Sequence, residues 1–250
     1  MAAHSPSSPA ARAKKPTVYE TYLRTDELLA LQKPEAERLH SDELTFQIVH
    51  QTFELWWKMT VEQLALARAC FDEGRYGEAA RALRRAVSAQ GVVMQAIRQL
   101  EFVAPADFLT IRAGLGNGSG ADSPGFRAIL RAAPDLWEAF TGALAHEGLT
   151  LLHVYSAPNA HLLLYDCAEA LTDFDEQFHL FRAAHLKLAE RNLGLRAIGT
   201  GGTPMPALEK TLRDLLFPEL WEVRDELLAQ SQTHAGSADG ADANVSGHGL

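Results

Sequence analysis

Residues 42–59 read DELTFQIVHQTFELWWKM, and the apolar residues among them recur with the period of an α-helix. At about 100° per residue, the polar side chains gather in one stripe: Glu43, Gln47, Gln51, Glu54 and Lys58. Beside this stripe lie Phe46, His50, Phe53 and Trp57, and apolar residues fill the rest of the surface. A helix that is apolar around most of its surface is buried on several sides. We therefore expect this helix to lie inside a helical bundle.

His50 falls on the aromatic face of this helix, next to the polar stripe. Burying an imidazole costs free energy unless a partner satisfies its nitrogen atoms. His50 is therefore either a core residue that is hydrogen-bonded to a backbone carbonyl or a residue that lines an aromatic pocket. The helix alone leaves both interpretations open.

The composition indicates one domain with a substantial core, because the chain has 250 residues and is 47% apolar. The formal net charge is −9 and the longest basic run is Lys14-Lys15, so we expect no nucleic-acid partner. Cys70 and Cys167 lie far apart, which argues against a disulfide framework or a zinc site. The N-terminus lacks an apolar signal core, and no run of about 18 apolar residues is present. We expect a cytoplasmic protein with no membrane partner.

Helical periodicity runs through the chain between two tails, 1–16 and 231–250, that are rich in small and polar residues and are expected to be disordered. We therefore predict an all-α domain over residues 17–230. The predicted helices cover residues 19–32, 42–59, 62–72, 76–102, 108–115, 126–144, 161–194 and 206–228. Pro134 is expected to break the helix over 126–144, and the glycine-rich residues 114–125 are expected to form a loop.

The second informative helix carries six residues on one face: Leu171, Phe174, Phe178, Phe181, His185 and Leu188. His185 thus lies in line with three phenylalanines, as His50 lies beside aromatic residues. Two such histidines are compatible with a dinuclear metal site, with a haem pocket or with two core residues. A dinuclear site in a bundle uses repeated Glu-x-x-His motifs, and only Glu176 and His179 show that spacing. Because the chain has no Cys-x-x-Cys-His motif, any haem is bound non-covalently.

Two further features suggest a polar end to such a pocket. Arg112 follows Phe108 by four residues, on the same helical face beside the glycine-rich loop. A guanidinium group there is able to bind a carboxylate through two hydrogen bonds, although a surface ion pair is the simpler interpretation. Residues 199–203, GTGGT, lack the lysine and the spacing of a phosphate-binding loop. They form either a flexible connector or a loop at the edge of a pocket whose backbone contacts a small polar ligand.

In this order and spacing, the motifs resemble the tryptophan 2,3-dioxygenase superfamily, the histidine-ligated haem dioxygenases. The matching segments are YxxYL at residues 19–23, DE…F…HQxxELW at 42–56, FxxxR at 108–112 with LGxxSG at 115–120, DFDE at 173–176 through FR…H, ER and G to residue 194, and GTGGT with LFPELWEVR at 199–203 and 216–224. They span most of residues 17–228.

The resemblance implies a buried haem b, with His185 as the iron ligand and Phe181 and Gly120 at the cofactor. It implies that His50 faces the indole nitrogen of the substrate in a pocket that Phe46 and Phe108 also line. Arg112 would bind the substrate carboxylate, with Ser119, Gly120 and Thr200 at the same amino-acid end. Tyr19, Tyr22 and Leu23 would reach into the pocket of a neighbouring subunit in a homotetramer.

The sequence departs from the family in the loop that follows Arg112. The family pattern is SGFQSxQ, whereas residues 119–125 read SGADSPG. Ala121 and Asp122 replace a Phe and a Gln, and Gly125 replaces the second Gln. We therefore expect a smaller, more acidic and more flexible loop that leaves space beside the indole.

The implied function is a haem-dependent oxygenase that uses dioxygen on the indole C2–C3 bond of L-tryptophan or of a ring- or β-substituted tryptophan. The product would be a formylkynurenine by dioxygenation or an oxindole by monooxygenation. A haem-dependent tyrosine hydroxylase of the same superfamily and a non-catalytic haem-binding protein are the alternatives.

Overall fold

A computed structural model describes residues 15–198, 209 and 212–242, and all of its described elements are helices. The all-α prediction is therefore confirmed. The contacts divide the chain into two units, residues 1–38 and residues 39–250. Within the described residues, no helix combines the length and the apolarity that are needed to cross a membrane.

The first unit contains α1 (Val18–Leu23), α2 (Thr25–Leu29) and the 3₁₀-helix η1 (Glu35–Glu37). A capping box at Thr17 begins α1, and Arg24 ends it in the left-handed conformation with φ 53°. The single helix predicted over residues 19–32 is therefore wrong, because the left-handed residue turns the chain between two short helices. Neither α1 nor α2 buries a residue.

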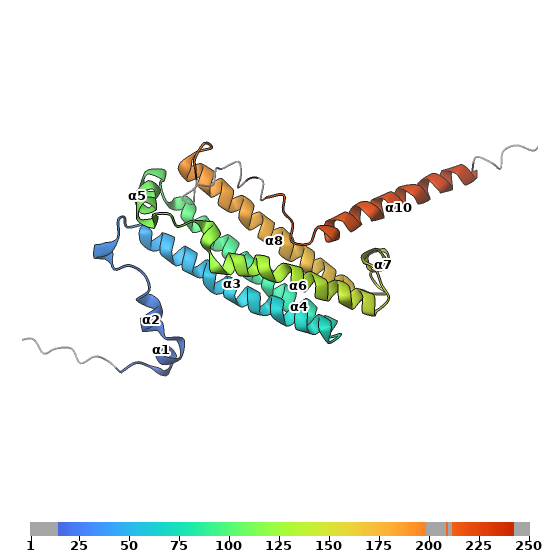
Figure 1. Cartoon of the computed structure of the whole chain (residues 1–250), viewed down its shortest axis with the longest axis horizontal. Coiled ribbons are helices and arrows are strands. Elements are labelled where there is room, and N and C mark those ends of the chain that lie inside the picture. The colour runs from blue at the N-terminus through green and yellow to red at the C-terminus, as the bar shows by residue number, and fades with distance from the viewer. Residues whose placement is uncertain (1–14, 199–208, 210–211, 243–250) are drawn as a thin grey trace, which may run out of the picture. The chain divides into compact units, whose positions relative to one another are not determined.

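The second unit is built on four long helices that lie side by side (Figure 1): α3 (Glu43–Asp72), α4 (Tyr76–Ile97), α6 (Pro124–His146) and α8 (Leu162–Leu193). Helix α3 packs on α4 and α6, and α4 also packs on α8. Shorter elements connect them: η2 (Arg98–Phe102), α5 (Pro105–Leu115), η3 (Gly120–Asp122) and α7 (Leu151–Ser156). Helix α10 (Pro218–Asp242) follows and extends into the segment that was expected to form the C-terminal tail.

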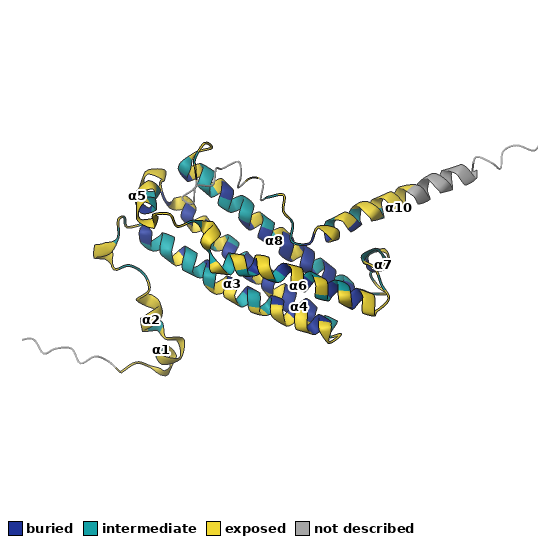
Figure 2. Ribbon diagram, in the orientation of Figure 1, coloured by how far each residue is buried: buried dark blue, intermediate teal, exposed yellow. Residues whose placement is uncertain are grey.

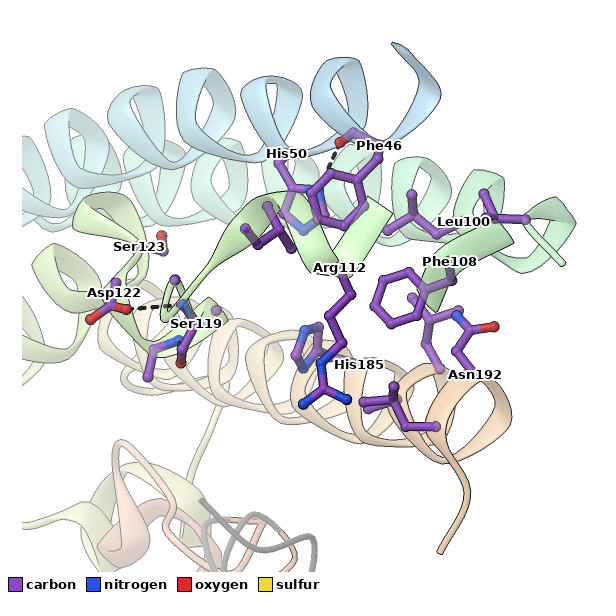
Figure 3. A pocket seen from close by; sticks show the side chains of 18 of the residues that line it. Phe46, His50, Leu100, Phe108, Arg112, Ser119, Asp122, Ser123, His185 and Asn192 are labelled. Atoms are coloured by element: carbon purple, nitrogen blue, oxygen red, sulfur yellow. Dashed lines mark hydrogen bonds between the residues drawn. The ribbon is translucent and has the colours of Figure 1, made fainter. Parts of the chain in front are cut away.

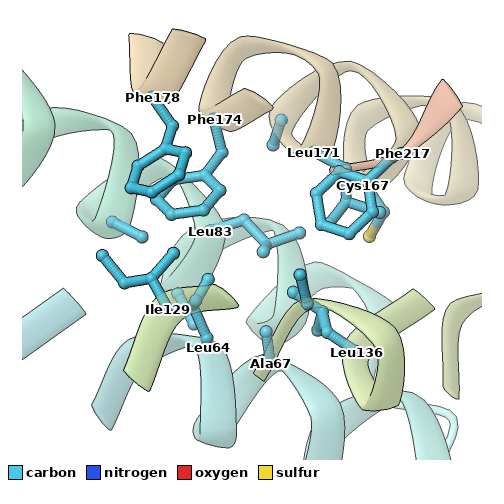
Figure 4. Close-up of a cluster of buried hydrophobic side chains, with 14 of the residues drawn as sticks. Leu64, Ala67, Leu83, Ile129, Leu136, Cys167, Leu171, Phe174, Phe178 and Phe217 are labelled. Atoms are coloured by element: carbon cyan, nitrogen blue, oxygen red, sulfur yellow. The ribbon is translucent and has the colours of Figure 1, made fainter. Parts of the chain in front are cut away.

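The buried side chains lie on the inner faces of the four long helices (Figure 2). At the centre, Leu64 of α3, Leu83 of α4 and Ile129 of α6 meet Phe174 of α8 (Figure 4). Burial of each such side chain contributes about 1.5–3 kcal/mol. Alanines line the buried face of α4 and let its neighbours approach closely: Ala79, Ala80, Ala82, Ala86 and Ala89.

Helix α6 runs without interruption through Pro134, so the predicted break is wrong. Proline costs a helix about 3 kcal/mol because it removes one hydrogen bond and crowds the preceding turn. Ala133, Leu136 and Phe140 are buried on both sides of this point, at 2% exposure or less. Their packing is sufficient to offset that cost.

Asp175 attaches the start of α10 to α8. Its carboxylate is fully buried and accepts hydrogen bonds from the backbone N–H groups of Leu216 and Phe217, at 2.9 and 3.2 Å, and from the indole N–H of Trp221, at 3.1 Å. Trp221 is thus held by a specific buried carboxylate.

Candidate haem and substrate pocket

A cavity of about 420 Å³ opens at the α5 end of the bundle, between α3, α5, α8 and the loop at residues 116–123. A second cavity of about 330 Å³ adjoins it on the side of α6. The two cavities share six lining residues: His50, Glu54, Gly120, Ala121, Ser123 and His185. Both histidines that the sequence singled out therefore lie in the walls of one hollow region (Figure 3).

His50 projects from α3 into this region, and its Nδ1 lies 2.7 Å from the backbone carbonyl oxygen of Phe46. A carbonyl oxygen only accepts, so Nδ1 carries the proton and Nε2 keeps a free lone pair. Burial lowers the pKa of His50, which the Phe46 carbonyl and the charge of Glu54 only partly oppose. Both interpretations of His50 are thus correct, because it is bonded to a backbone carbonyl and it lines the pocket.

His185 projects from α8, and its ring stacks on Phe181 with centroids 6.2 Å apart. Burial, with a smaller contribution from the nearby His50, lowers the pKa of His185 to about 4. The imidazole is therefore neutral at neutral pH, which is the form that binds a metal. Gly120 approaches this ring so closely that an added Cβ atom would lie 3.4 Å from both Cε1 and Nε2 of His185.

These residues fit haem b. A histidine-ligated haem uses a neutral imidazole and an apolar slot, and His185 lies beside Phe181, which packs edge-on against Phe53 and Trp57 at 5.5 and 5.2 Å. A dinuclear carboxylate site does not fit. In the part of the chain that the structure describes, the one group of three possible metal ligands is His40, Asp42 and Asp107, which includes neither pocket histidine. Glu176 and His179 line neither cavity.

Helix α5 supplies the other predicted pocket residues. The ring of Phe108 lies 6.3 Å from that of Phe46, and both line the cavity with Arg112. No ion pair of Arg112 occurs among the described residues. Its Nη2 instead donates to the backbone carbonyl of Ile198, at 2.7 Å, and Arg112 and His185 both line the cavity (Figure 3). The simple surface ion pair is therefore not what the structure contains.

The loop at residues 116–123 closes on itself through its own polar groups. The carboxylate of Asp122 accepts from the backbone N–H of Ser119, at 3.0 Å, and the Ser119 hydroxyl accepts from the N–H of Ala121, at 3.1 Å. Asp122 thus orders the loop through a capping box. The acidic residue that distinguishes this loop has a local structural partner.

The expectation that Gly125 leaves space and flexibility is wrong. Gly125 lies in the first turn of α6, and a Cβ atom added there would lie 2.7 Å from Oε2 of Glu54 and 2.8 Å from Cβ of Trp57. The start of α6 occupies the volume that a side chain would need. Ala121, by contrast, lines both cavities.

Four of the predicted site residues remain predictions. Thr200 and the rest of the GTGGT segment lie outside the described residues. Tyr19, Tyr22 and Leu23 belong to the separate first unit.

The sequence did not indicate a role for Glu54, whose carboxylate accepts hydrogen bonds from Ser123 and Gly125. Ser123-Pro124 is a helix-start signature that could have indicated the loop end of this contact.

Comparisons with known proteins agree with this geometry. The family model described as tryptophan 2,3-dioxygenase matches residues 4–132. Tryptophan 2,3-dioxygenase of Caulobacter vibrioides is 34% identical over 260 residues, covering 84% of this chain and 98% of that protein. The enzyme of Rhodococcus jostii is 31% identical, covering 84% and 91%, and that of Erythrobacter litoralis is 32% identical, covering 82% and 97%. This chain therefore belongs to the tryptophan 2,3-dioxygenase family of haem-dependent enzymes, with haem b as its cofactor.

Proposed function

We propose that this protein binds L-tryptophan, or a ring- or β-substituted tryptophan, in the larger cavity and inserts oxygen at the indole C2–C3 bond. His185 would hold the haem iron, with Phe181 and Gly120 against the cofactor. His50 would orient the indole, and Phe46 and Phe108 would enclose it. Bound haem would supply the iron that activates dioxygen.

The observation that carries this proposal is the protonation pattern of His50. Its Nδ1–H is committed to the Phe46 carbonyl, so Nε2 is left as an acceptor in an aromatic pocket. An indole N–H group is a donor only, and the neutral His50 is matched to it. His50 holds the indole N–H in place and excludes water together with Phe46; it does not need to remove a proton. Such orientation of the reacting atoms lowers the barrier by restricting the substrate to a productive geometry.

Arg112 would bind the substrate carboxylate at the mouth of the cavity. Its present partner is a neutral carbonyl, that of Ile198. A carboxylate offers a stronger, charge-assisted partner for the same guanidinium group. Ser119, Gly120 and Thr200 would contact the same amino-acid end, where Thr200 lies two residues beyond Ile198.

The altered loop at residues 119–125 affects which substrate fits the cavity and which product forms. Ala121, where the family pattern has a Phe, leaves space along the cavity wall, and a methyl substituent that fills such space gains about 0.8 kcal/mol. We propose that a substituted tryptophan is processed at least as well as tryptophan. A smaller wall also admits more water. A formylkynurenine takes up both atoms of dioxygen, whereas an oxindole takes up one and requires two electrons from a reductant to convert the other to water, so the oxygen count of the product distinguishes these two outcomes.

A direct test combines two measurements on the purified haem protein. Added tryptophan should shift the Soret band of the ferrous protein, whereas a haem-binding protein without a substrate site would show no shift. Mass spectrometry with labelled dioxygen then counts the oxygen atoms in the product of tryptophan and of β-methyltryptophan. Turnover of tyrosine alone would contradict the proposal and identify a phenol hydroxylase.

We also propose that the protein is a cytoplasmic homotetramer and that residues 17–230 form its haem-binding oxygenase domain. Val18, Tyr19 and Tyr22 are 87%, 68% and 84% exposed, so α1 presents apolar side chains without a core of its own. Covering such side chains with a second copy would remove apolar area from water. Removing residues 1–25 should impair both assembly and tryptophan affinity, and a fully active monomer would contradict the proposed assembly.

A further inference from the structure

The carboxylate of Glu54 joins helix α3 to the end of the loop at residues 116–123. It accepts a hydrogen bond from the Ser123 hydroxyl and a second one from the backbone N–H of Gly125, at 2.9 Å. Glu54 lies one turn after His50 and lines both cavities. The helix that carries His50 is thus tied directly to the loop that carries Ser119 and Gly120.

Ser123 links Glu54 to helix α6 through a second hydrogen bond. Its hydroxyl donates to Glu54 and accepts from the backbone N–H of Phe126, at 3.1 Å, as the N-cap of α6. A carboxylate beside a helix N-terminus also gains from the helix dipole. Both oxygens of Glu54 are therefore used at one point, where the loop ends and the helix begins.

Gly125 makes this close approach possible. An added Cβ atom would lie 2.7 Å from the carboxylate oxygen of Glu54 and 2.8 Å from Cβ of Trp57. The Trp57 atom is next to the backbone of α3 and cannot move away easily. A side chain at position 125 would therefore push the start of α6 away from Glu54.

The other end of the loop is held only locally: the backbone N–H of Gly118 donates to the carbonyl of Leu115, at 3.0 Å, and among the described residues no side-chain hydrogen bond joins residues 116–118 to another helix. Gly116 has φ 56°, a conformation that glycine adopts without strain, and a Cβ atom added there would meet nothing within 4 Å. The loop is thus attached to α3 at Ser123–Gly125 and to α6 also through Arg127, which donates to the Asp122 carbonyl at 2.6 Å, whereas at Gly116 it continues from α5 through one local turn. Gly120, between these two points, lies against the ring of His185.

We infer that Glu54 is a positioning residue, which fixes the loop at Ser123 and Gly125 and thereby sets how closely Ser119 and Gly120 approach the pocket. The part of this inference that concerns substrate rests on the proposed function. Removing the Glu54 contact would detach the loop from α3, so that the amino-acid end of a substrate is held less firmly. The core of the bundle would keep its packing in Glu54→Ala, because Glu54 is not one of the buried residues.

Hydrogen exchange of the full-length protein tests the attachment without any substrate. Glu54→Ala and Gly125→Ala break the contact from opposite sides, and we expect both to speed amide exchange in residues 116–123 by about tenfold, as befits the loss of one to two hydrogen bonds. Ser123→Ala should have a smaller effect of the same kind. Glu62→Ala is the matched control, since Glu62 is exposed on the same helix.

Glu54→Gln separates the hydrogen bonds from the charge. The amide oxygen is able to accept from Gly125 N–H while its NH₂ group donates to Ser123, so exchange should stay within about twofold of wild type. Unchanged exchange in Glu54→Ala and Gly125→Ala, with melting temperatures near that of wild type, would overturn the inference whatever the reaction proves to be.

Substrate affinity tests the second half. We expect Glu54→Ala and Gly125→Ala to weaken tryptophan binding to the ferrous haem protein by about tenfold, with the haem content and the Soret band of the substrate-free protein unchanged. Faster loop exchange with unchanged tryptophan affinity would overturn the role in substrate positioning. Absence of tryptophan binding in the wild-type protein would instead contradict the proposed function, and the exchange result would still stand.

Discussion

The apolar residues of helix α3 recur with one helical period along its whole length, but those at its two ends have different surroundings. Toward its C-terminal end, Leu64 and Ala67 are at most 1% exposed and meet α4, α6 and α8 in a continuous core (Figure 4). Toward its N-terminal end, Phe46 and His50 face a cavity of about 420 Å³ instead of another helix. The residues that line this cavity have fewer side chains of the protein to pack against than the residues of the core. The packed end therefore supports the end that binds.

The largest expected effect concerns the cavity end of the bundle, where His185 of α8 lies. His185→Ala should abolish stoichiometric haem binding, because His185 is the neutral imidazole beside the aromatic slot. Helical content, measured by circular dichroism, should stay near that of wild type, since His185 belongs to the cavity wall. His179→Ala on the same helix is the matched control and should retain haem. Full haem content with an unchanged axial-histidine spectrum in His185→Ala would show that another residue holds the iron.

At the C-terminal end of α3, which is packed in the core, we expect a substitution to lower stability and leave haem binding intact. Leu64→Ala removes a fully buried side chain and should lower the free energy of unfolding by about 2–5 kcal/mol. The folded fraction should still bind haem with a wild-type spectrum, because Leu64 lines neither cavity. Leu66→Ala, where the leucine is 41% exposed, should change the unfolding free energy by about 0.5 kcal/mol or less. A lost Soret band in folded Leu64→Ala protein would mean that the two ends are coupled.

A smaller effect is expected at His50. His50→Ala should keep haem and weaken tryptophan binding or turnover by about 1–3 kcal/mol, as expected for a lost buried hydrogen bond. Steady-state kinetics measure this change, and His146→Ala, at an exposed position of α6, serves as the control. Wild-type kinetics in His50→Ala would leave the Phe46 hydrogen bond as the only role of His50.

The same contrast explains what could be predicted from the sequence. Helical periodicity alone placed His50 beside Phe46 and Phe53, and His185 in line with Phe181, because side chains three and four residues apart share a face. It could not reveal that Glu54 meets Ser123 and Gly125, about 70 residues away, since that contact depends on how α6 packs on α3.

Local rules failed where long-range packing decides the outcome. Proline predicted a break at Pro134, but the buried residues around it keep α6 continuous. Glycine predicted flexibility at Gly125, but there the missing side chain permits a close contact between helices. Arg24 gave no sequence signal for its left-handed conformation, because that conformation is uncommon for any residue except glycine.

The smallest expected effect lies at the packed end, near α7, and depends on pH. Tyr155 donates to Glu169 at 2.6 Å, and Arg224 binds the same carboxylate oxygen at 2.8 Å. Burial, together with the bond to Glu169, raises the pKa of Tyr155 to about 12 from its ordinary value of 10.0. The unfolded chain thus loses this proton at lower pH than the folded protein, so the stability that Tyr155 contributes is complete below about pH 10 and is lost as the pH rises toward 12.

Tyr155→Phe should cost about 0.5–1.5 kcal/mol at neutral pH, the usual contribution of one hydrogen bond, because Glu169 keeps Arg224 as a partner. The difference in melting temperature between wild type and Tyr155→Phe should shrink between pH 10 and pH 12, since the variant has no phenol to ionise. Haem content and tryptophan affinity should be unchanged, because Tyr155 lines neither cavity. A difference that stays constant up to pH 12 would show that the phenol does not ionise on unfolding in this range, and altered haem binding would show that the closed end of the bundle also shapes the open one.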